Sequence, residues 1–424
     1  MLSISKEKLA EILLFILLLL VFIDVEPFHI YKYSMMESSE GNIKRQIAYL
    51  LVCLPSILIA FIYSNRFRLQ FKKELIILFL LLWCFLSIAW SDAPSISFRR
   101  LVATILIVYA IMSLLAMVTN QENLLKILLL TSGITIFINC IGIIFLPKLS
   151  IIQSGSQSGL WKGLHEGKNI AGNVSAIFTI MWFWAGLIFP KWKKYFWLIS
   201  LLCVVFLFNT ASKTPIIVLF LSFIITYSLW KGVRNIINFS FLLWFVATIS
   251  IIGIAILSFV SFDEIILFVF NDPRYVGFTG RTDVWAYLIE NIIQHPLLGV
   301  GYEAFWTVGE NSRSLGISVA WAQETIHGHQ GYLDILTTIG IPGFILLILF
   351  MFSAFNKIFV FRKAKILPVF MFYNILIFGL IYNLTESTLL HKYHFMWVLM
   401  LISIFQLRIN YIQRKTPYEH PNPS

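Results

Sequence analysis

Only 12% of the residues in this 424-residue chain are charged and 59% are hydrophobic, and its mean hydropathy is +0.84. Soluble domains carry about 25% charged residues and lack unbroken apolar runs of membrane-spanning length, so a soluble fold is excluded. The formal net charge of +11 arises mostly from short connections between apolar runs, where anionic lipid headgroups attract basic residues. It therefore gives no reason to expect nucleic acid as a partner.

The apolar runs predict an all-α polytopic bundle of about twelve membrane spans. A bilayer core about 30 Å thick requires roughly 20 apolar residues in a helix, and this chain supplies such runs from end to end. In chain order, we expect spans at residues 9–28, 46–63, 75–91, 101–118, 127–146, 174–190, 195–211, 215–231, 238–262, 331–354, 367–385 and 392–408. No small-residue cleavage site follows residues 22–25, so we interpret the first run as a retained span.

Basic residues in the connections predict the orientation of the chain. With the N-terminus in the cytoplasm, the inside connections and the tail hold Arg66, Arg68, Lys72, Lys73, Lys191, Lys193, Lys194, Lys231, Arg234, Lys357, Arg362, Lys363, Lys365, Arg408, Arg414 and Lys415. The long outside connection holds only Arg274, Arg281 and Arg313. We therefore expect both termini in the cytoplasm and the long connection on the opposite face of the membrane.

Two outside segments divide the chain. Residues 1–262 form spans one to nine and include a polar periplasmic loop at 147–173, residues 263–330 form the large periplasmic loop, and residues 331–424 form the last three spans and a cytoplasmic tail. Within the large loop, Thr282 to Gln294 predicts an amphipathic helix. Its apolar positions at helical spacing are Trp285, Leu288, Ile289, Ile292 and Ile293.

The four cysteines lie inside apolar runs and form no CxxC pair. They are Cys53, Cys84, Cys140 and Cys203. Free cysteines pack as small hydrophobic residues, so disulfides and thiolate metal sites are not expected.

His329 opens the most specific polar pattern, HQGYLDILTTIGIPGF. Gln330 follows it, and after nine intervening residues come Gly340 and then Gly343. Eleven steps of about 100° would place His329 and Gly340 on nearly the same helix face, where small residues let a neighbouring helix pack closely. The positive end of the helix dipole would favour a neutral imidazole, the form that acts as a base. The alternative is a structural histidine at the interface.

Arg281 stands in a second pattern, TGRTDVW followed by HPLLGVGYEAFW. Its guanidinium is a permanently charged fork of donors suited to phosphate oxygens. Gly299 and Gly301 allow a tight turn with exposed backbone amides, although a single GxG is weak evidence. Alternatively, Arg281 only anchors the amphipathic helix.

Two further patterns carry lysines. In WKGLHEGKNIAGN, Lys168 and Asn169 could bind an anionic or sugar ligand, or the segment could be a basic loop on the membrane surface. In NTASKTP, Lys213 sits at a break between two apolar runs. A lysine at that depth is costly unless it is paired or bound to a ligand, and a snorkelling lysine is the alternative.

A metal site is not predicted. His327 and His329, with Glu324, are possible ligands in an extended segment, but no third ligand has a recognisable spacing. We expect no metal and no cofactor.

Glu386 and Gln330 are second-tier candidates, together with His327. Glu386 lies near His391 in the last outside loop and could bind an acceptor or pair with a basic residue. A solvated loop acid is the alternative.

These patterns together resemble the O-antigen ligase and O-antigen polymerase superfamily of bacterial membrane glycosyltransferases. The resemblance rests on HQ followed by GIPG, on GRTDVW with HPLLGVG, and on the SKT break, and WKGLHEGKN is similar to the exopolysaccharide-polymerase branch. It covers roughly residues 155–345 by motif and the whole chain by topology, and it implies a GT-C-like helical bundle.

The resemblance also implies residue roles. His329 matches the family's catalytic histidine, and Arg281 matches an arginine thought to hold pyrophosphate. Lys213 stands where many members have a second arginine. This departure keeps the charge but loses the bidentate fork.

By this resemblance, the chain is expected to be an inner-membrane, metal-independent, inverting glycosyltransferase. It would move a glycan from undecaprenyl pyrophosphate to a sugar hydroxyl on the periplasmic face, most simply polymerising O-antigen, capsule or exopolysaccharide units. The alternatives are a ligase that uses lipid A core as acceptor and, in another class, a lipid-linked oligosaccharide transporter. A flippase and a chain-length regulator are candidate protein partners.

Overall fold

The structure is a computed structural model, and it describes residues 5–25, 27–28, 42–155, 157–231, 281–306, 312–317, 327–355 and 367–415. Every regular element in these residues is helical. The helices are α1 (Lys6–Ile23), α3 (Ile43–Tyr63), α4 (Asn65–Lys73), α5 (Leu75–Leu86), η1 (Ser87–Trp90), α6 (Pro94–Met117), α7 (Gln121–Phe145), α8 (Pro147–Ser150), α9 (Lys168–Ile188), η2 (Pro190–Trp192), α10 (Lys193–Asn209), α11 (Lys213–Lys231), α14 (Arg281–Gln294), η4 (Arg313–Gly316), α16 (Gly331–Phe352), α18 (Leu367–Tyr382) and α19 (Phe395–Lys415).

The helices confirm the predicted all-α polytopic class. Seven helices of the described residues are long and apolar enough to cross a membrane, and an eighth if the pair α4 and α5, bent by 67°, is one span. Each predicted span except 238–262 coincides with a helix, and residues 238–262 lie outside the described residues. The figure of twelve spans stays a prediction.

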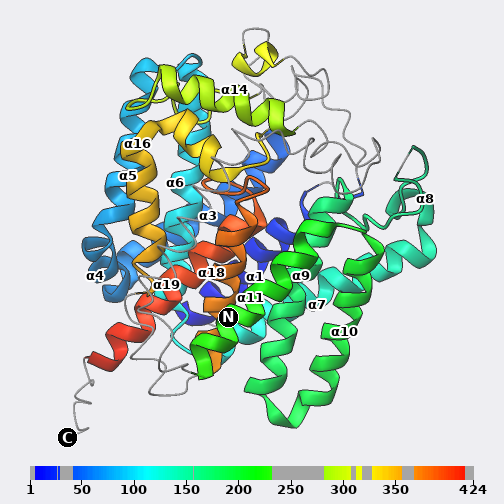
Figure 1. Cartoon of the computed structure of the whole chain (residues 1–424). Coiled ribbons are helices and arrows are strands. Elements are labelled where there is room, and N and C mark those ends of the chain that lie inside the picture. The colour runs from blue at the N-terminus through cyan, green and yellow to red at the C-terminus, as the bar shows by residue number, and fades with distance from the viewer. Residues whose placement is uncertain are drawn as a thin grey trace, which may run out of the picture.

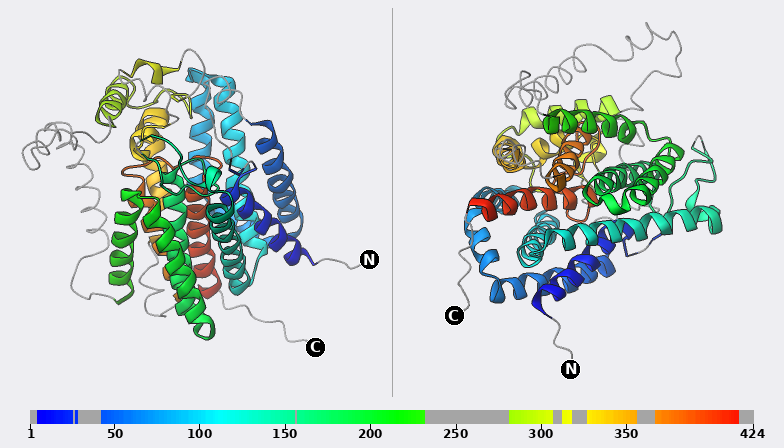
Figure 2. Two further views of the ribbon diagram at one scale, coloured as in Figure 1. Left: turned by 90° about the vertical axis from the view of Figure 1, so that its right-hand side faces the viewer. Right: turned by 90° about the horizontal axis from the view of Figure 1, so that it is seen from below.

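Helix α18 forms the centre of the bundle. It packs against α9, α11 and α19, and nearly all of its side chains are buried (Figure 2). Successive helices run in opposite directions, so the starts of α9, α11, α16 and α19 lie at the same end as the end of α18 (Figure 1). The polar motifs of the sequence are thereby collected at one end of the molecule.

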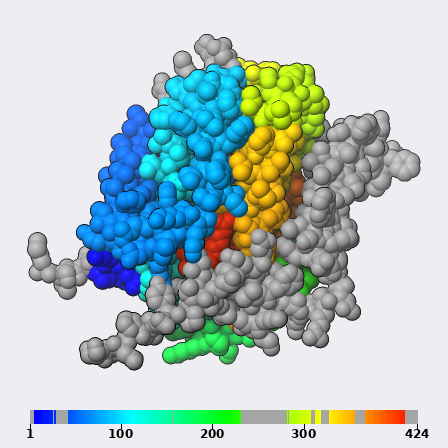
Figure 3. All heavy atoms as spheres, turned by 90° about the vertical axis from the view of Figure 1, so that its left-hand side faces the viewer, coloured from blue at the N-terminus to red at the C-terminus, as the bar shows by residue number. Residues whose placement is uncertain are grey.

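Helix α14 lies across this end and packs on the start of α16 (Figures 1 and 3). It begins at Arg281, and Trp285 and Leu288 on its apolar face belong to a small second core with Phe305 and Leu333. Ile293 was predicted on the same face but is 72% exposed. The buried face is therefore narrower than the sequence pattern suggested.

The two glycine motifs dock against each other through their backbones. The amides of Val300 and Gly301 donate to the carbonyls of Thr337 and Thr338, each at 2.9 Å. Gly340 has φ 63° and ψ −172°, which interrupts α16, and a Cβ there would lie 2.2 Å from the carbonyl oxygen of Leu297.

His329 and Gly340 therefore do not share a helix face. His329 precedes the first residue of α16, and the helix is broken at Gly340. Gly340 accommodates the loop that contains Gly299, whereas Gly343 lies against the Trp83 side chain of α5. The glycine spacing thus serves one loop contact and one helix contact.

Replacement of Gly340 by alanine is expected to destabilise the protein by at least about 3 kcal/mol. Its backbone conformation is essentially restricted to glycine, at a cost of about 1–3 kcal/mol, and the new methyl group would also meet a backbone oxygen. Thermal unfolding in detergent measures the loss. Gly159→Ala is the control, because Gly159 also has a positive φ of 87° but has nothing within 4 Å of its Cβ position. Equal losses in both variants would show that the docking contact contributes nothing.

Candidate functional site

The chain on both sides of His329 is fixed by the loop that follows α18. The amide of Gln330 donates to Ser387 Oγ at 2.9 Å, and the amide of Gly331 donates to the carbonyl oxygen of Glu386 at 3.0 Å. His329 itself has φ 52°, the left-handed region that few non-glycine residues adopt. The position of its imidazole is therefore set by tertiary contacts from a distant part of the sequence.

Glu386 joins His329 to Arg281. One carboxylate oxygen lies 3.0 Å from Nδ1 of His329, and the other accepts from the Arg281 guanidinium at 3.0 Å. The same guanidinium donates to the carbonyl oxygen of Thr385 at 2.8 Å. The three side chains are only 10% to 19% exposed, so water screens their charges weakly. We call His329, Glu386 and Arg281 the imidazole cluster.

His327 extends the imidazole cluster. Its ring centroid lies 4.3 Å from that of His329 and 6.4 Å from that of His391. Burial lowers the pKa of His327 well below its usual range, and the neighbouring His329, His391, His394 and Arg281 lower it further. His327 is therefore neutral, and its Nδ1 accepts from the His329 amide at 3.3 Å.

Gln330 has a structural position within this arrangement. It is the N-cap of α16, and its side-chain oxygen accepts from the Leu333 amide at 2.6 Å. Only 2% of its surface is exposed. Capping a helix in this way typically stabilises it by about 1 kcal/mol.

The ligand atoms of His327, His329 and Glu386 lie within 4.8 Å of one another, as in a group that could hold a metal ion. The sequence pattern had offered no third ligand, and the fold supplies Glu386 from the last loop. However, Glu386 is also held by the guanidinium of Arg281, whose positive charge opposes a divalent cation at the same carboxylate. Metal independence stays a prediction.

A second group of charges next to the imidazole cluster was not found from the sequence. Lys392 donates to Glu303 at 2.8 Å, and Arg100 lies 3.8 Å from the same carboxylate. Burial works against the charge of Glu303, but Lys392, His391 and Arg100 outweigh it and hold its pKa below the usual glutamate value. Glu303 lies within the motif HPLLGVGYEAFW, but its partners come from two other segments, so the sequence pattern did not indicate the pairing.

Lys168, Asn169 and Lys213 lie together at the starts of α9 and α11. The hydroxyl of Ser212 donates to the Lys168 carbonyl at 3.0 Å and lies 3.3 Å from the Asn169 side-chain oxygen. The two segments approach closely because Gly172 has no side chain, and a Cβ there would lie 2.8 Å from that of Ser212. Asn169 and Lys213 are exposed. The fold thus brings the WKGLHEGKNIAGN and NTASKTP motifs to one place.

Tyr382 connects this lysine pair to the imidazole cluster. It ends α18, which packs against both α9 and α11. Its phenol lies beside Asn173 of α9 and within electrostatic range of Arg281 and Glu386. The lysines and the imidazole cluster therefore occupy neighbouring positions at the same end of the bundle.

Comparison with known proteins gives two matches. Residues 198–348 match the family model described as O-antigen ligase. The exopolysaccharide production protein ExoQ of Rhizobium meliloti (strain 1021) is 34% identical over 79 residues, which is 18% of this chain and 18% of that protein. The segment matched by the family model contains Lys213, Arg281 and His329.

Glu303→Gln is expected to lower the free energy of unfolding at pH 7 by up to about 3 kcal/mol, because Arg100 and Lys392 lose a buried counter-charge. Since the folded protein holds the pKa of Glu303 below the ordinary glutamate value of 4.5, this contribution is present above pH 4.5 and is lost as the pH falls through the lowered pKa. The variant and the wild type should thus converge in acid. Unfolding in detergent across this pH range measures the difference.

The control for this prediction is Glu122→Gln. Glu122 pairs with Lys126 on an exposed helix surface, where an ion pair contributes about 0.3–0.5 kcal/mol. A difference between Glu303→Gln and the wild type that did not depend on pH would contradict the electrostatic assignment.

Proposed function

We propose that this chain, whose residues 198–348 match the O-antigen ligase family model, transfers a glycan from undecaprenyl pyrophosphate to the hydroxyl group of an acceptor sugar. The observation that carries this proposal is the imidazole cluster, in which Glu386 bonds to both His329 and Arg281. In this proposal, the cluster would supply a base, the residue that orients the base and a fixed positive charge as one hydrogen-bonded unit.

In the proposed reaction, His329 accepts the proton of the acceptor hydroxyl through Nε2. The hydroxyl oxygen forms a bond to the anomeric carbon of the donor glycan, and the bond from that carbon to the pyrophosphate oxygen breaks with inversion. Its electron pair leaves with undecaprenyl pyrophosphate. Glu386 bonds to Nδ1 of His329 and stabilises the imidazolium that forms. The aspartate carboxylate of a catalytic triad acts on its histidine in the same way.

Arg281 is proposed to stabilise the leaving group. A guanidinium has five N–H donors, so it can bind a phosphate oxygen while it keeps its bond to Glu386. Lys213 and Lys168 would add positive charge from the neighbouring helix starts, and Asn169 would add hydrogen bonds. Stabilisation of developing charge by fixed groups is commonly the largest catalytic contribution, and each such donor is typically worth about 100- to 1000-fold in rate. These cations would serve in place of a metal.

The acceptor decides between a polymerase and a ligase. The similarity to a protein named for exopolysaccharide production, together with the WKGLHEGKN motif, favours polymerisation of repeat units. A ligase would instead use lipid A core as acceptor. A transporter would carry ionisable residues within many spans and would show repeat symmetry. The motifs of this chain gather at one end of the bundle instead.

The basic residues of the short connections support an orientation with both termini in the cytoplasm of the bacterial inner membrane. The imidazole cluster would then face the periplasm, the side on which the transfer is proposed to occur. The same orientation underlies the proposed division into spans one to nine (1–262), a large periplasmic loop (263–330) and the last three spans with a cytoplasmic tail (331–424). A flippase and a chain-length regulator would be the partners of this protein.

His329→Ala is expected to abolish glycan transfer. Loss of a general base typically costs about 100- to 10,000-fold in rate, and the deletion also removes the partner of Glu386. Release of undecaprenyl pyrophosphate by purified protein, and complementation of a deletion strain, measure the effect. His295→Ala, a histidine of the same loop outside the imidazole cluster, is the control. A fully active His329→Ala protein would exclude the mechanism, and flipping of the donor without release would favour a transporter.

Glu386→Gln is expected to slow transfer by about 10- to 100-fold, part of the contribution of the base. The amide cannot stabilise the imidazolium that forms in the proposed reaction, so kcat should fall. Glu290→Gln, at an exposed position of α14, is the control. A wild-type kcat in Glu386→Gln would contradict this role of Glu386.

A further inference from the structure

A cavity of about 740 Å³ lies beside the imidazole cluster. The residues that line it come from the end of α1, the starts of α3, α6 and α16, the segment 164–166 with Ile170 of α9, the segment 302–306 and the loop 387–395. Its volume is within the roughly 300–1,000 Å³ that encloses a small organic molecule. The mechanism proposed above assigns no role to it.

The cavity approaches the imidazole cluster from one side. Gly331, Ser387 and His391 line it. Ser387 accepts from the amide of Gln330, the residue next to His329, and the ring of His391 lies 6.4 Å from that of His327. A molecule in the cavity would therefore lie close to the proposed base.

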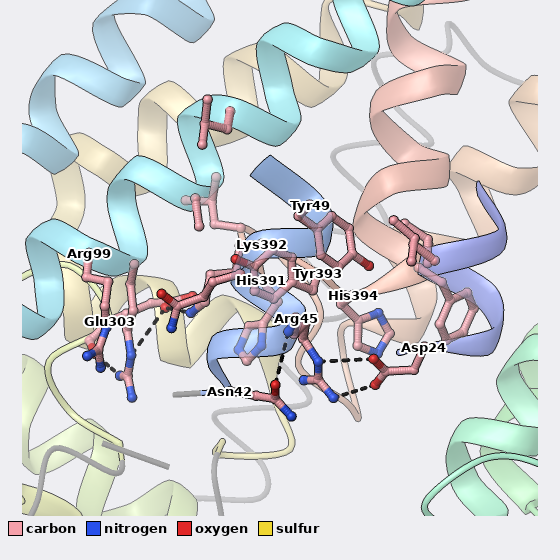
Figure 4. A pocket seen from close by; sticks show the side chains of 18 of the residues that line it. Asp24, Asn42, Arg45, Tyr49, Arg99, Glu303, His391, Lys392, Tyr393 and His394 are labelled. Atoms are coloured by element: carbon pink, nitrogen blue, oxygen red, sulfur yellow. Dashed lines mark hydrogen bonds and ion pairs between the residues drawn. The ribbon is translucent and has the colours of Figure 1, made fainter. Parts of the chain in front are cut away.

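The charges at the cavity wall occur in pairs (Figure 4). Arg45 donates to Asp24 with both Nε and a terminal nitrogen, and Lys392 and Arg100 share Glu303. Figure 4 shows Glu303 next to Lys392, and Arg45 with Asp24 next to Tyr393 and His394. Each of these three cations lies against an acidic partner, which weakens its attraction for an anion, although Lys392 and Arg100 share a single carboxylate. The paired groups can still donate and accept hydrogen bonds, which suits an uncharged polyhydroxylated molecule.

Aromatic rings supply the other part of the wall. Tyr49 and Tyr393 stack with their centroids 4.2 Å apart, and Trp306 also lines the cavity. The flat C–H faces of a sugar ring bury well against aromatic faces, while its edge hydroxyls need polar partners. Both requirements are met within this one cavity.

His165 adds a neutral polar group. It lines the cavity, and burial lowers its pKa to about 3, so the imidazole carries no charge. Its Nε2 has no hydrogen-bond partner within the part of the chain that the structure describes. A buried polar atom without a partner is costly, and a sugar hydroxyl reached by a turn of the ring would satisfy it.

From this lining we infer that the cavity is the acceptor subsite and binds the terminal sugars of the acceptor glycan as an uncharged oligosaccharide. The inference rests on the proposed function, since it presents an acceptor hydroxyl to His329. It distinguishes this cavity from the place of the diphosphate, which the lysines and Arg281 would hold.

The test measures binding in the His329→Ala background, where no turnover is needed. The probe is an oligosaccharide released by mild acid from the lipid-linked glycan donor of the bacterium that makes this protein. It is labelled with a fluorophore at its reducing end. Full-length protein in lipid nanodiscs is titrated by fluorescence anisotropy. Tyr49→Ala and Tyr393→Ala should each weaken binding by about tenfold or more, as expected for aromatic anchors. Tyr49→Phe and Tyr393→Phe, which keep the ring face, should weaken it much less.

Tyr195→Ala, an exposed tyrosine of α10, is the control. Where an alanine variant is not monodisperse, Tyr49→Leu or Tyr393→Leu removes the aromatic face and keeps most of the volume. Unchanged oligosaccharide binding in these variants would overturn the inference, as would a loss of inorganic pyrophosphate binding in place of oligosaccharide binding. Glycan transfer retained by His329→Ala would contradict the proposed mechanism but would not change this binding result. Failure of the proposed function and failure of the acceptor-subsite inference are therefore distinguishable.

Discussion

The carboxylate of Glu386 is the contact on which the site depends. It binds the imidazole of His329 with one oxygen and the guanidinium of Arg281 with the other, both at 3.0 Å. A carboxylate can hold both because it offers several lone pairs, and at 10% exposure it is poorly solvated without them. The start of α14, the start of α16 and the loop after α18 are thereby held in one place.

Backbone hydrogen bonds also hold the segment after α14 against α16. The loop containing Gly299 and Gly301 bonds to the carbonyls of Thr337 and Thr338, and Gly340 provides the space that this approach requires. The loop that carries Glu303 follows directly from it. The position of the imidazole cluster and one wall of the cavity therefore have a common structural origin.

The two kinds of charge in the molecule suit two different ligands. Around the cavity, Arg45 pairs with Asp24, and Lys392 and Arg100 share Glu303. At the starts of α9 and α11, Lys168 and Lys213 lie near each other, and Lys213 is exposed. In the proposed transfer, the lysines would hold the charged leaving group and the cavity would hold the uncharged acceptor.

The sequence by itself determined the helical membrane class, the position of most spans and the motifs around His329, Arg281 and Lys213, because apolar run length and glycine spacing are local properties of a chain. Only the tertiary structure decided that Glu386 binds His329 and Arg281, that Gly340 breaks α16 and that Glu303 meets Lys392 and Arg100. These contacts join segments up to 203 residues apart in the case of Arg100 and Glu303. Such pairings follow from helix packing, and no spacing within one segment encodes them.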